Sequence, residues 1–315
     1  MQEKYTQNPT FSTSSGLSTP VLFLIFNRPD TTKQVFSAIQ KARPSRLYVA
    51  GDGPRAEQSN EYEICKITRS IATNVDWDCE VKTLFRDQNL GCRQAVSQAI
   101  SWFFKNEPEG IILEDDCLPS ESFFMFCQEL LEQFRDDKKV GAICGFYSNE
   151  IDYKPSASYF FSRYLRVWGW AGWRRTFEGY DSNIKSLIEK NNTWQSDIFN
   201  HKDVLLKKYF QQMFDQVLKN KIDTWDTQLQ YLLWQKKQQV IVSSKNLIQN
   251  IGWTQGAHAQ TKDHNHNLPT SEIGFPLTSP EIVERDVKAD KEIELKSYQI
   301  TKISYLKSQL RKLVP

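Results

Sequence analysis

Four short apolar runs alternate with three segments of helical periodicity between residues 20 and 120, and this alternation limits the fold more than any other feature. The first run, residues 21–26, contains no polar side chain, which is typical of a strand buried on both faces. The alternation predicts an α/β fold, with a mostly parallel sheet flanked by helices. The other runs lie at residues 47–50, 79–85 and 110–113, and the helical segments at residues 31–41, 57–73 and 92–105.

Helical periodicity also predicts which faces of two segments are buried. In the second segment, Ile64, Ile67 and Ile71 recur on one side. In the third, the apolar side is expected to consist of Ala95, Val96, Ala99, Ile100 and Phe103.

The chain after residue 145 follows a different pattern. We expect aromatic loops over residues 159–173, helices near residues 200–220 and 225–236, and a short strand at residues 240–242. A polar segment with three histidines follows Gly252. At the other end, residues 1–19 are rich in Ser and Thr and are expected to form a disordered tail.

Charge and composition narrow the function classes. The 40 Lys and Arg residues nearly balance the 38 Asp and Glu residues, so the net charge of +2 gives no argument for a nucleic-acid partner. No apolar run approaches the roughly 18 residues of a membrane span, and residues 1–20 lack the apolar core of a signal peptide. None of the six cysteines forms a CxxC pair, and we interpret them as reduced core thiols of a cytoplasmic protein.

Polar residues or glycine follow each of the four runs directly. In an open parallel α/β sheet, ligands bind beyond the carboxyl ends of the strands, so these positions are the candidate site. They are Asn27 and Arg28, Asp52, Asn89 to Gly91, and Glu114-Asp115-Asp116.

The Glu114-Asp115-Asp116 triplet is the most informative of these positions. Three adjacent carboxylates repel one another unless positive charge is present, and a hard cation such as Mg²⁺ or Mn²⁺ prefers oxygen ligands. The alternative is a solvated acidic turn before the helix that begins near Ser120. The position after the fourth run of an alternating array favours the metal site.

Taken in order, these motifs resemble those of the GT-A glycosyltransferases. The motifs are Phe-Asn-Arg-Pro at residues 26–29, Asp-Gly-Pro at residues 52–54, Arg-Asp-Gln-Asn-Leu-Gly at residues 86–91, and Ile-Ile-Leu-Glu-Asp-Asp at residues 111–116. The chain looks most like bacterial sugar transferases related to N-acetylglucosaminyltransferase I, in which the DxD motif is written EDD. The resemblance is clear over residues 20–120 and weaker to about residue 260.

The resemblance implies a GT-A (Rossmann-like) fold with an acceptor-side C-terminal half. It implies a nucleotide-sugar-binding half at residues 20–145 and an acceptor-binding half of the same body at residues 146–285. By the same resemblance, the donor is a nucleoside-diphosphate sugar, with a UDP-sugar favoured, and the cofactor is Mn²⁺ or Mg²⁺. The acceptor would be a hydroxyl of a glycan, a lipid-linked glycan or a protein.

The resemblance also assigns roles to single positions. Asn27 and Arg28 would border the base, and Asp52 would accept a hydrogen bond from it. Asn89 and Gly91 would lie against the ribose or the sugar. The acidic triplet would complete the donor site, with Glu114 in it, Asp115 facing the ribose or donor sugar, and Asp116 binding the metal.

Simpler interpretations of the same residues stay open. Arg28 could be a surface cation, Asp52 a turn former beside Gly53, and Gly91 only a tight turn. There is no GxGxxG after the first run and no GxxxxGK[ST], which disfavours a dinucleotide site and a P-loop. The alternative functions are a sugar nucleotidyltransferase and a non-catalytic carbohydrate- or nucleotide-binding module.

Three tryptophans alternate with small residues at residues 168–173. Trp168, Trp170 and Trp173 are either core residues or rings that stack on the acceptor or donor sugar, since sugars stack well on indole. Just upstream, Arg163 and Arg166 could face the diphosphate or solvent.

Asp226 is the candidate general base of an inverting transfer. Such a transfer needs a carboxylate that takes the proton of the acceptor hydroxyl, and the resemblance places one before a helix in this region. Asp226 could instead only favour the start of its helix. Asp181 and Asp223 are weaker rivals.

Two further features lie late in the chain. By resemblance, His258 would help to hold the metal, whereas His264 and His266 are more simply solvated; a site made of the three histidines is the less favoured alternative. Residues 286–315 are expected to form a basic amphipathic helix. Its segment 295–313 would contact a membrane, the core or a second copy. Membrane contact would place the protein at the inner face of the cytoplasmic membrane.

Overall fold

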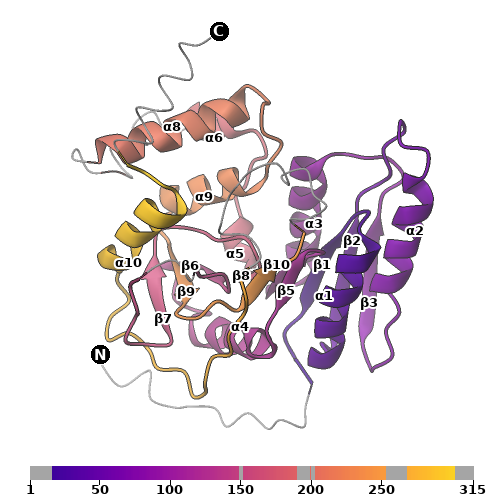
Figure 1. The fold of residues 1–315 in the computed structure, drawn as a ribbon, viewed down its shortest axis with the longest axis horizontal. Helices are drawn as coiled ribbons and strands as arrows, with labels where there is room; N and C mark the ends of the chain where they lie inside the picture. Colours follow the sequence, from indigo (N-terminus) through magenta and orange to yellow (C-terminus); the bar gives the residue numbers. More distant parts are fainter. Residues whose placement is uncertain (1–15, 149–151, 190–198, 200–202, 253–267, 302–315) are drawn as a thin grey trace.

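The computed structural model describes residues 16–148, 152–189, 199, 203–252 and 268–301. Its centre is an eight-stranded sheet in the order β3-β2-β1-β4-β8-β6-β9-β7, flanked by helices (Figure 1). This is the predicted α/β architecture, with helices on a sheet whose strands β3, β2, β1 and β4 are parallel. The strands are β1 Val21–Ile25, β2 Arg46–Gly51, β3 Glu80–Phe85, β4 Glu109–Glu114, β6 Val140–Cys144, β7 Tyr159–Ser162, β8 Trp170–Trp173 and β9 Gln239–Ser243.

The first half forms parallel βαβ units, as the alternation predicts. Strand β1 pairs in parallel with β2 on one side and with β4 on the other, and all five of its residues are buried. Between the strands run the predicted helices, each within a few residues of its expected bounds. They are α1 Pro29–Ala42, α2 Glu61–Ala72 and α3 Cys92–Asn106, and α4 Glu121–Gln133 follows the acidic triplet.

The expected aromatic loops of the second half are wrong, because residues 159–173 contain two strands. Strand β8 runs antiparallel between β4 and β6, and β7 runs antiparallel to β9. All four residues of each are buried, so the aromatic rings pack in the core. Strand β6 was not expected either, whereas the strand expected at residues 240–242 is the centre of β9.

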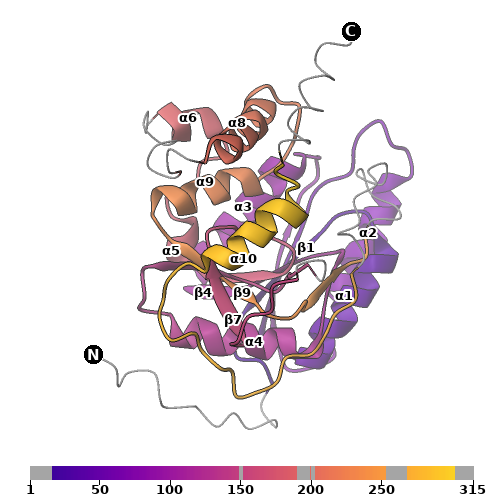
Figure 2. The same ribbon diagram turned by 60° about the vertical axis from the view of Figure 1, so that its left-hand side comes forward.

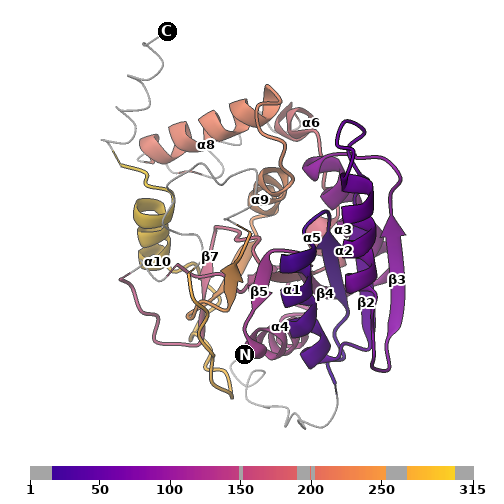
Figure 3. The same cartoon turned by 45° about the vertical axis from the view of Figure 1, so that its right-hand side comes forward.

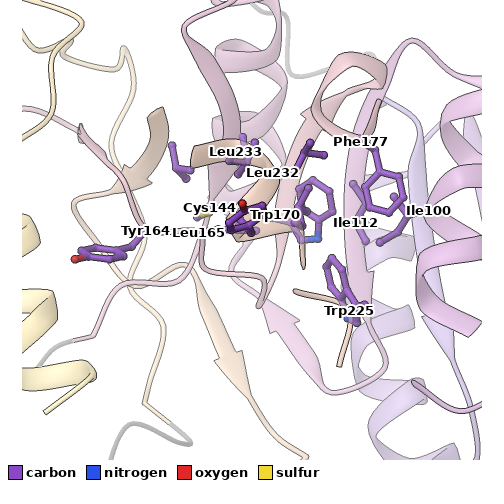
Figure 4. Packing of buried hydrophobic residues seen from close by; sticks show 14 of the residues in the cluster. Ile100, Ile112, Cys144, Tyr164, Leu165, Trp170, Phe177, Trp225, Leu232 and Leu233 are labelled. Carbon is purple, nitrogen blue, oxygen red and sulfur yellow. The ribbon is translucent and has the colours of Figure 1, made fainter. Parts of the chain in front are cut away.

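Two apolar cores cover the two faces of this sheet. Leu22 and Leu24 of β1 face the core beneath α3 and α9 (Asp226–Gln235), and Phe23 faces the core beneath α1 and α4. Figure 4 shows the first core, in which Trp170 of β8 lies between Trp225 and residues of α3 and β4. Residues from both halves of the chain contribute to each core.

Further helices lie over the second half of the sheet. In Figures 1 and 3, α8 (Val204–Leu218) lies outside α9, and α6 (Ile184–Glu189) lies beside α8. The short α5 (Arg174–Phe177) follows β8. Figure 2 shows α10 (Val287–Glu292) packed across the body beside β7, and α10 continues as a π-helical turn over Ile293–Ser297.

A two-stranded ribbon links the acidic triplet to the late part of the chain. Strand β5 (Cys117–Pro119) follows Asp116 and pairs antiparallel with β10 (Ile248–Asn250). The amide of Ile251 donates to the carbonyl of Asp116 at 2.8 Å. The ribbon therefore brings Gly252 to the end of β4.

Two residues differ in burial from what the sequence indicates. Ile67 of α2 is 52% exposed, and the helix turns Cys65, Thr68 and Ala72 inward instead. Leu17, expected in the disordered tail, is buried, and its amide donates to the Ala42 carbonyl. Of the predicted C-terminal helix, residues 302–315 lie outside the described residues, as do residues 1–15 of the tail. In the described part of the chain, no helix is both long and apolar enough to cross a membrane.

Candidate active site

The site forms where the direction of the chain across the sheet reverses. From β1 the sheet grows to β2 on one side and to β4 on the other, and ligands of such sheets bind beyond the carboxyl ends of the strands at this point. Arg28 follows β1 and the acidic triplet follows β4. The Arg28 Nη1 lies 2.5 Å from Asp116 Oδ2 and 3.6 Å from Asp115 Oδ1. The structure therefore brings together the residues that follow these two strands, a contact that the sequence did not specify.

Local hydrogen bonds hold this arrangement in place. Asp115 is 3% exposed, and its Oδ2 accepts from the Phe26 amide at 3.1 Å. Pro29 begins α1 directly after Arg28, because its ring fixes a helical φ and its lack of an N–H costs nothing at that position. Arg28 is therefore not a free surface cation, because its side chain joins the end of β1 to the end of β4.

Negative charge exceeds positive charge in this corner. Burial, reinforced by Asp116 and Asp115, raises the pKa of Glu114 to about 8. Burial also raises the pKa of Asp115 to about 7, although Arg28 opposes the shift. One guanidinium faces three carboxyl groups, so full ionisation of the triplet needs the further positive charge that a bound cation would supply.

Asp52 and Asn89 join the ends of β2 and β3. The Asp52 carboxylate accepts from the amides of Gly53, Leu90 and Gly91 at 2.9 to 3.1 Å. The Asn89 amide donates to the Gly53 carbonyl at 2.9 Å. Asp52 is therefore more than a turn former, since it fixes the loop before α3; its contact with a base stays a prediction.

Asn27 has a structural partner as well. Its side-chain amide donates to Glu61 Oε1 at 2.8 Å, and Glu61 also pairs with Arg55 at 2.5 Å. Glu61 is 4% exposed and lies at the start of α2. This group holds the loop after β2 against the loop after β1, and the contact of Asn27 with a base stays a prediction.

Two glycines allow the backbone to approach the charged groups closely. Gly91 has a φ of +79°, and a Cβ there would lie 2.8 Å from Asp223 Oδ2. At Gly252, a Cβ would lie 2.6 Å from Arg28 Nη1 and closer still to the Asp116 carboxylate. The position of Gly252 could not be predicted from the sequence, because nothing local relates this residue to a triplet more than 130 residues earlier.

Asp226 lies in the same group of charges. Trp225, just before it, stacks on the buried Trp170 with ring centroids 6.1 Å apart, and Trp170 pairs with Ile112 of β4. Asp226 is among the charges that raise the pKa of Glu114, after burial and the two neighbouring aspartates. The structure thus brings the start of α9 to the end of β4.

In the described part of the chain, one oxygen of the Asp226 carboxylate accepts hydrogen bonds and the other accepts none. Its Oδ1 accepts from the Thr224 hydroxyl and, at 2.8 Å, from the Thr227 amide. Among the described residues, no hydrogen bond reaches Oδ2. The contact of Oδ1 with the Thr227 amide agrees with a role at the helix start, whereas the role of Asp226 as a general base stays a prediction.

The two rival carboxylates differ in their surroundings. Asp181 accepts from the Asn183 amide at 2.8 Å and from the Ser186 hydroxyl, at the start of α6. Asp223 is half exposed and lies 3.5 Å from the Arg93 Nε. Asp223 therefore borders the site, next to Gly91, and remains a candidate to be tested.

Cys92, predicted to be a core thiol, is exposed at the start of α3. Although part of the residue reaches solvent, desolvation of the thiol by nearby protein and the negative charges of Glu114, Asp223 and Asp226 raise its pKa to about 12. It therefore stays protonated near pH 7 and is a poor nucleophile.

Two of the three predicted sugar-stacking tryptophans are core residues. Trp170 is 0% and Trp173 2% exposed, so neither ring offers a face to a ligand. The reason is that both belong to β8, in the middle of the sheet. Trp168, before the strand, is only partly buried and packs edge-on against Phe146 at 4.7 Å. Its contact with a sugar stays a prediction.

The residues fit a hard divalent cation that is shared with a ligand. Carboxylate oxygens are its preferred donors, and the observation that favours it is the gathering of three adjacent carboxyl groups around the single guanidinium of Arg28. In the described parts of the chain, no three His, Cys, Asp or Glu side chains are arranged to hold a metal by themselves. His258 lies outside the described residues.

The sequence matches no family model and no curated protein sequence. Among solved structures, the galactosyltransferase LgtC with donor and acceptor sugar analogues is similar, with 11% identity, a TM-score of 0.29, and coverage of 55% of this chain and 65% of that one. UDP-glucose pyrophosphorylase with UDP-glucose is also similar, with 10% identity and a TM-score of 0.39. The match covers 72% of this chain and 90% of that one.

The 4-diphosphocytidyl-2C-methyl-D-erythritol synthase of Anaerococcus prevotii gives 8% identity and a TM-score of 0.32, with coverage of 55% and 84%. The chain spans slightly less than two thirds of the galactosyltransferase. All three of these TM-scores lie below 0.5.

Proposed function

We propose that this protein is a glycosyltransferase that uses a nucleoside-diphosphate sugar, with a UDP-sugar as the favoured donor. The observation that carries the proposal is the meeting of Arg28, the acidic triplet and Asp226 at the carboxyl edge of the sheet. The site joins an anionic corner, suited to a cation and a diphosphate, to a carboxylate with a free oxygen. The resemblance to N-acetylglucosaminyltransferase I relatives is consistent with it and stays part of the proposal.

In the proposed reaction, the acceptor hydroxyl attacks the anomeric carbon while its proton passes to Asp226 Oδ2. One C–O bond forms, the bond to the diphosphate breaks, and the electron pair leaves with the diphosphate. Attack from the side opposite the diphosphate inverts the anomeric centre. When bound, Mn²⁺ or Mg²⁺ supplies positive charge to the leaving diphosphate, with Asp116 as its protein ligand.

The other residues of the site orient these groups. Arg28 holds the carboxylates of Asp115 and Asp116 in place. Asp52 fixes the loop that contains Gly91, where the donor would approach the backbone. The acceptor would enter from the side of α9, which belongs to the second half of the chain.

The test is turnover of a panel of UDP- and other nucleoside-diphosphate sugars with Mn²⁺ present. We expect released UDP or another nucleoside diphosphate. A sugar nucleotidyltransferase would instead require pyrophosphate, and it would convert the nucleoside-diphosphate sugar into a nucleoside triphosphate and a sugar 1-phosphate. A binding module would bind the nucleotide without Mn²⁺ and turn nothing over. Either result contradicts the proposal.

Asp226→Asn provides the sharpest variant, because it removes the basic oxygen but keeps the helix start. Loss of a general base lowers turnover about 10²- to 10⁴-fold, and the affinity for UDP should stay within about twofold. Asp223→Asn is the matched control and should retain most of the activity. If Asp223→Asn shows the large loss and Asp226→Asn does not, the base is Asp223.

A further inference from the structure

Several arginines lie near the site or in the second half of the chain, and most of them form ion pairs with carboxylates of the protein. Arg163 lies 3.1 Å from Glu294, and Arg285 forms an ion pair with Asp290, which is fully buried. Arg28 forms an ion pair with Asp116 of the acidic triplet. The positive charges of these three arginines are therefore neutralised within the protein.

Arg166 differs from them. Its guanidinium lies over two aromatic rings, 4.9 Å from the centroid of Tyr298 and 5.8 Å from that of Phe146. In the described part of the chain, no carboxylate lies within 4 Å of it. The residue is partly buried, and its amide donates to Cys144 Sγ at 3.3 Å. Two rings thus hold in place a cation whose charge is not neutralised.

The strand register places Arg166 at the edge of the sheet that carries the site. Trp170 of β8 pairs with Ile112 of β4 and with Cys144 of β6, and β8 runs antiparallel to both. The residues before Trp170 therefore extend past the carboxyl ends of β4 and β6. This is the edge from which Glu114 emerges.

Helix α9 places Asp226 on the same side. Gln230 lies one turn after Asp226 and shares its helix face. Its side chain accepts from the Leu165 amide at 2.7 Å and donates to the Arg163 carbonyl at 3.0 Å. The face of α9 that carries the proposed base therefore packs on the segment that carries Arg166.

Tyr298 reaches this place because the C-terminal segment is anchored by buried charges. Asp290 accepts from the Ser162 hydroxyl and pairs with Arg285. Glu294 accepts from the Tyr164 hydroxyl at 2.7 Å and from Arg163. Four residues further on, the Tyr298 ring packs edge-on against Tyr164 at 5.2 Å.

We propose that Arg166 binds the diphosphate group of the donor, and that Tyr298 is a positioning residue that holds its guanidinium. The inference rests on the proposed function, which it deepens by naming the contact for the leaving group. Arg166 would donate hydrogen bonds to phosphate oxygens through its free N–H groups, a geometry for which a fixed guanidinium is well suited. The C-terminal segment is thereby part of the site.

The test measures calorimetric binding of inorganic pyrophosphate to the full chain in EDTA, without any sugar. Arg166→Gln should weaken binding at least about tenfold, since it removes charge-assisted hydrogen bonds. Arg43→Gln makes the same charge change at an exposed position after α1, at the opposite edge of the sheet, and should leave affinity unchanged. Thermal unfolding verifies that each variant is folded.

The role of Tyr298 is tested separately. Tyr298→Ala should weaken pyrophosphate binding about fivefold, whereas Tyr298→Phe, which keeps the ring, should bind within about twofold of the unsubstituted protein. Equal affinities for Tyr298→Ala and the unsubstituted protein would overturn the positioning role, as would an equal loss in Tyr298→Phe.

Absence of pyrophosphate binding, or unchanged binding in Arg166→Gln, would overturn the assignment of Arg166. The proposed function can fail independently. If no nucleotide sugar is turned over but pyrophosphate binding depends on Arg166, the anion site stands without the transferase. If sugars are turned over and Arg166→Gln behaves like the unsubstituted protein, the transferase stands without this contact.

Discussion

Gly252 shows how one position without a side chain can determine the geometry of a charged site. A methyl group there would meet Arg28 and Asp116 at distances that real Cβ atoms do not adopt. Both side chains would have to move, and the ion pair that joins β1 to β4 would be displaced. The close approach exists because the β5–β10 ribbon brings the late part of the chain directly over the triplet.

Gly252→Ala should therefore lower turnover and UDP affinity at least about tenfold while the protein remains folded, at a stability cost of about 1–3 kcal/mol for overpacking. Activity, isothermal titration with UDP and thermal unfolding measure the three effects. Gly274→Ala is the control, because a Cβ there meets nothing within 4 Å. Equal behaviour of the two variants would contradict the close approach.

Glu114 makes the stability of the protein depend on pH. Burial and the neighbouring aspartates raise its pKa to about 8, well above that of an unfolded carboxyl group. The folded state then binds more protons than the unfolded state between about pH 4 and pH 8. The free energy of unfolding contributed by this group is therefore highest at low pH and falls as the pH rises through that range.

In EDTA, Glu114→Gln should lose less stability than the unsubstituted protein between pH 5 and pH 9, and it should have the higher melting temperature at pH 9. Melting curves across that range measure the difference. Glu63→Gln removes an exposed carboxyl group of α2 and should leave the pH profile unchanged. A profile for Glu114→Gln parallel to that of the unsubstituted protein would contradict the raised pKa.

At the scale of elements, the first half could be predicted because its signals are local. A continuous apolar run followed by Asn-Arg-Pro-Asp indicates a strand that ends before a helix, and the strand-end rule then selects Arg28, Asp52 and the acidic triplet. Strand β8 could not be predicted in this way, since its four residues become a strand only by pairing with β4 and β6. Residues 170–173 are too short for a periodic signal.

Tertiary contacts also override the periodicity of α2. Glu61 is buried because it pairs with Arg55 and accepts a hydrogen bond from Asn27. As a result, a polar side of the first helical turn faces the protein interior. Ile67 is exposed as a result. A pattern of apolar residues alone cannot contain that information, because the partners of Glu61 lie in two loops.

The C-terminal element provides a prediction about buried and exposed ion pairs. Asp290 is fully buried and holds Arg285, the Ser162 hydroxyl and the Arg163 amide. Asp290→Ala should cost about 3 kcal/mol of unfolding free energy, because it leaves these donors without their acceptor. Urea unfolding measures the loss, and pyrophosphate affinity should fall with it if Tyr298 is displaced.

An exposed ion pair in the same element provides the control. Lys296 of the π-helical turn lies 3.6 Å from Asp152, which is 87% exposed. Asp152→Ala should change the unfolding free energy by less than about 1 kcal/mol. If both variants lose the same stability, burial is not what makes the Asp290 anchor strong.

At the scale of the whole molecule, the two halves of the chain are joined by one sheet and two shared cores. Strand β8 of the second half pairs with β4 of the first. Ile39 of α1 and Ile241 of β9 belong to the same apolar core. We propose that residues 20–145 and 146–285 form one cooperative unit, although their sequence patterns differ.

Ile39→Ala tests this unity, since Ile39 is fully buried in the first half and its truncation should cost about 2–5 kcal/mol. Seven of the nine tryptophans follow residue 146, so fluorescence reports mainly on the second half, while far-UV circular dichroism reports on both. In urea, the substitution should lower both midpoints by the same amount, with a single transition in each. The opposite result would be a circular dichroism curve that shifts or splits into two transitions while the fluorescence midpoint is unchanged. The two halves would then unfold independently, and the shared sheet would not couple the nucleotide side of the site to the acceptor side.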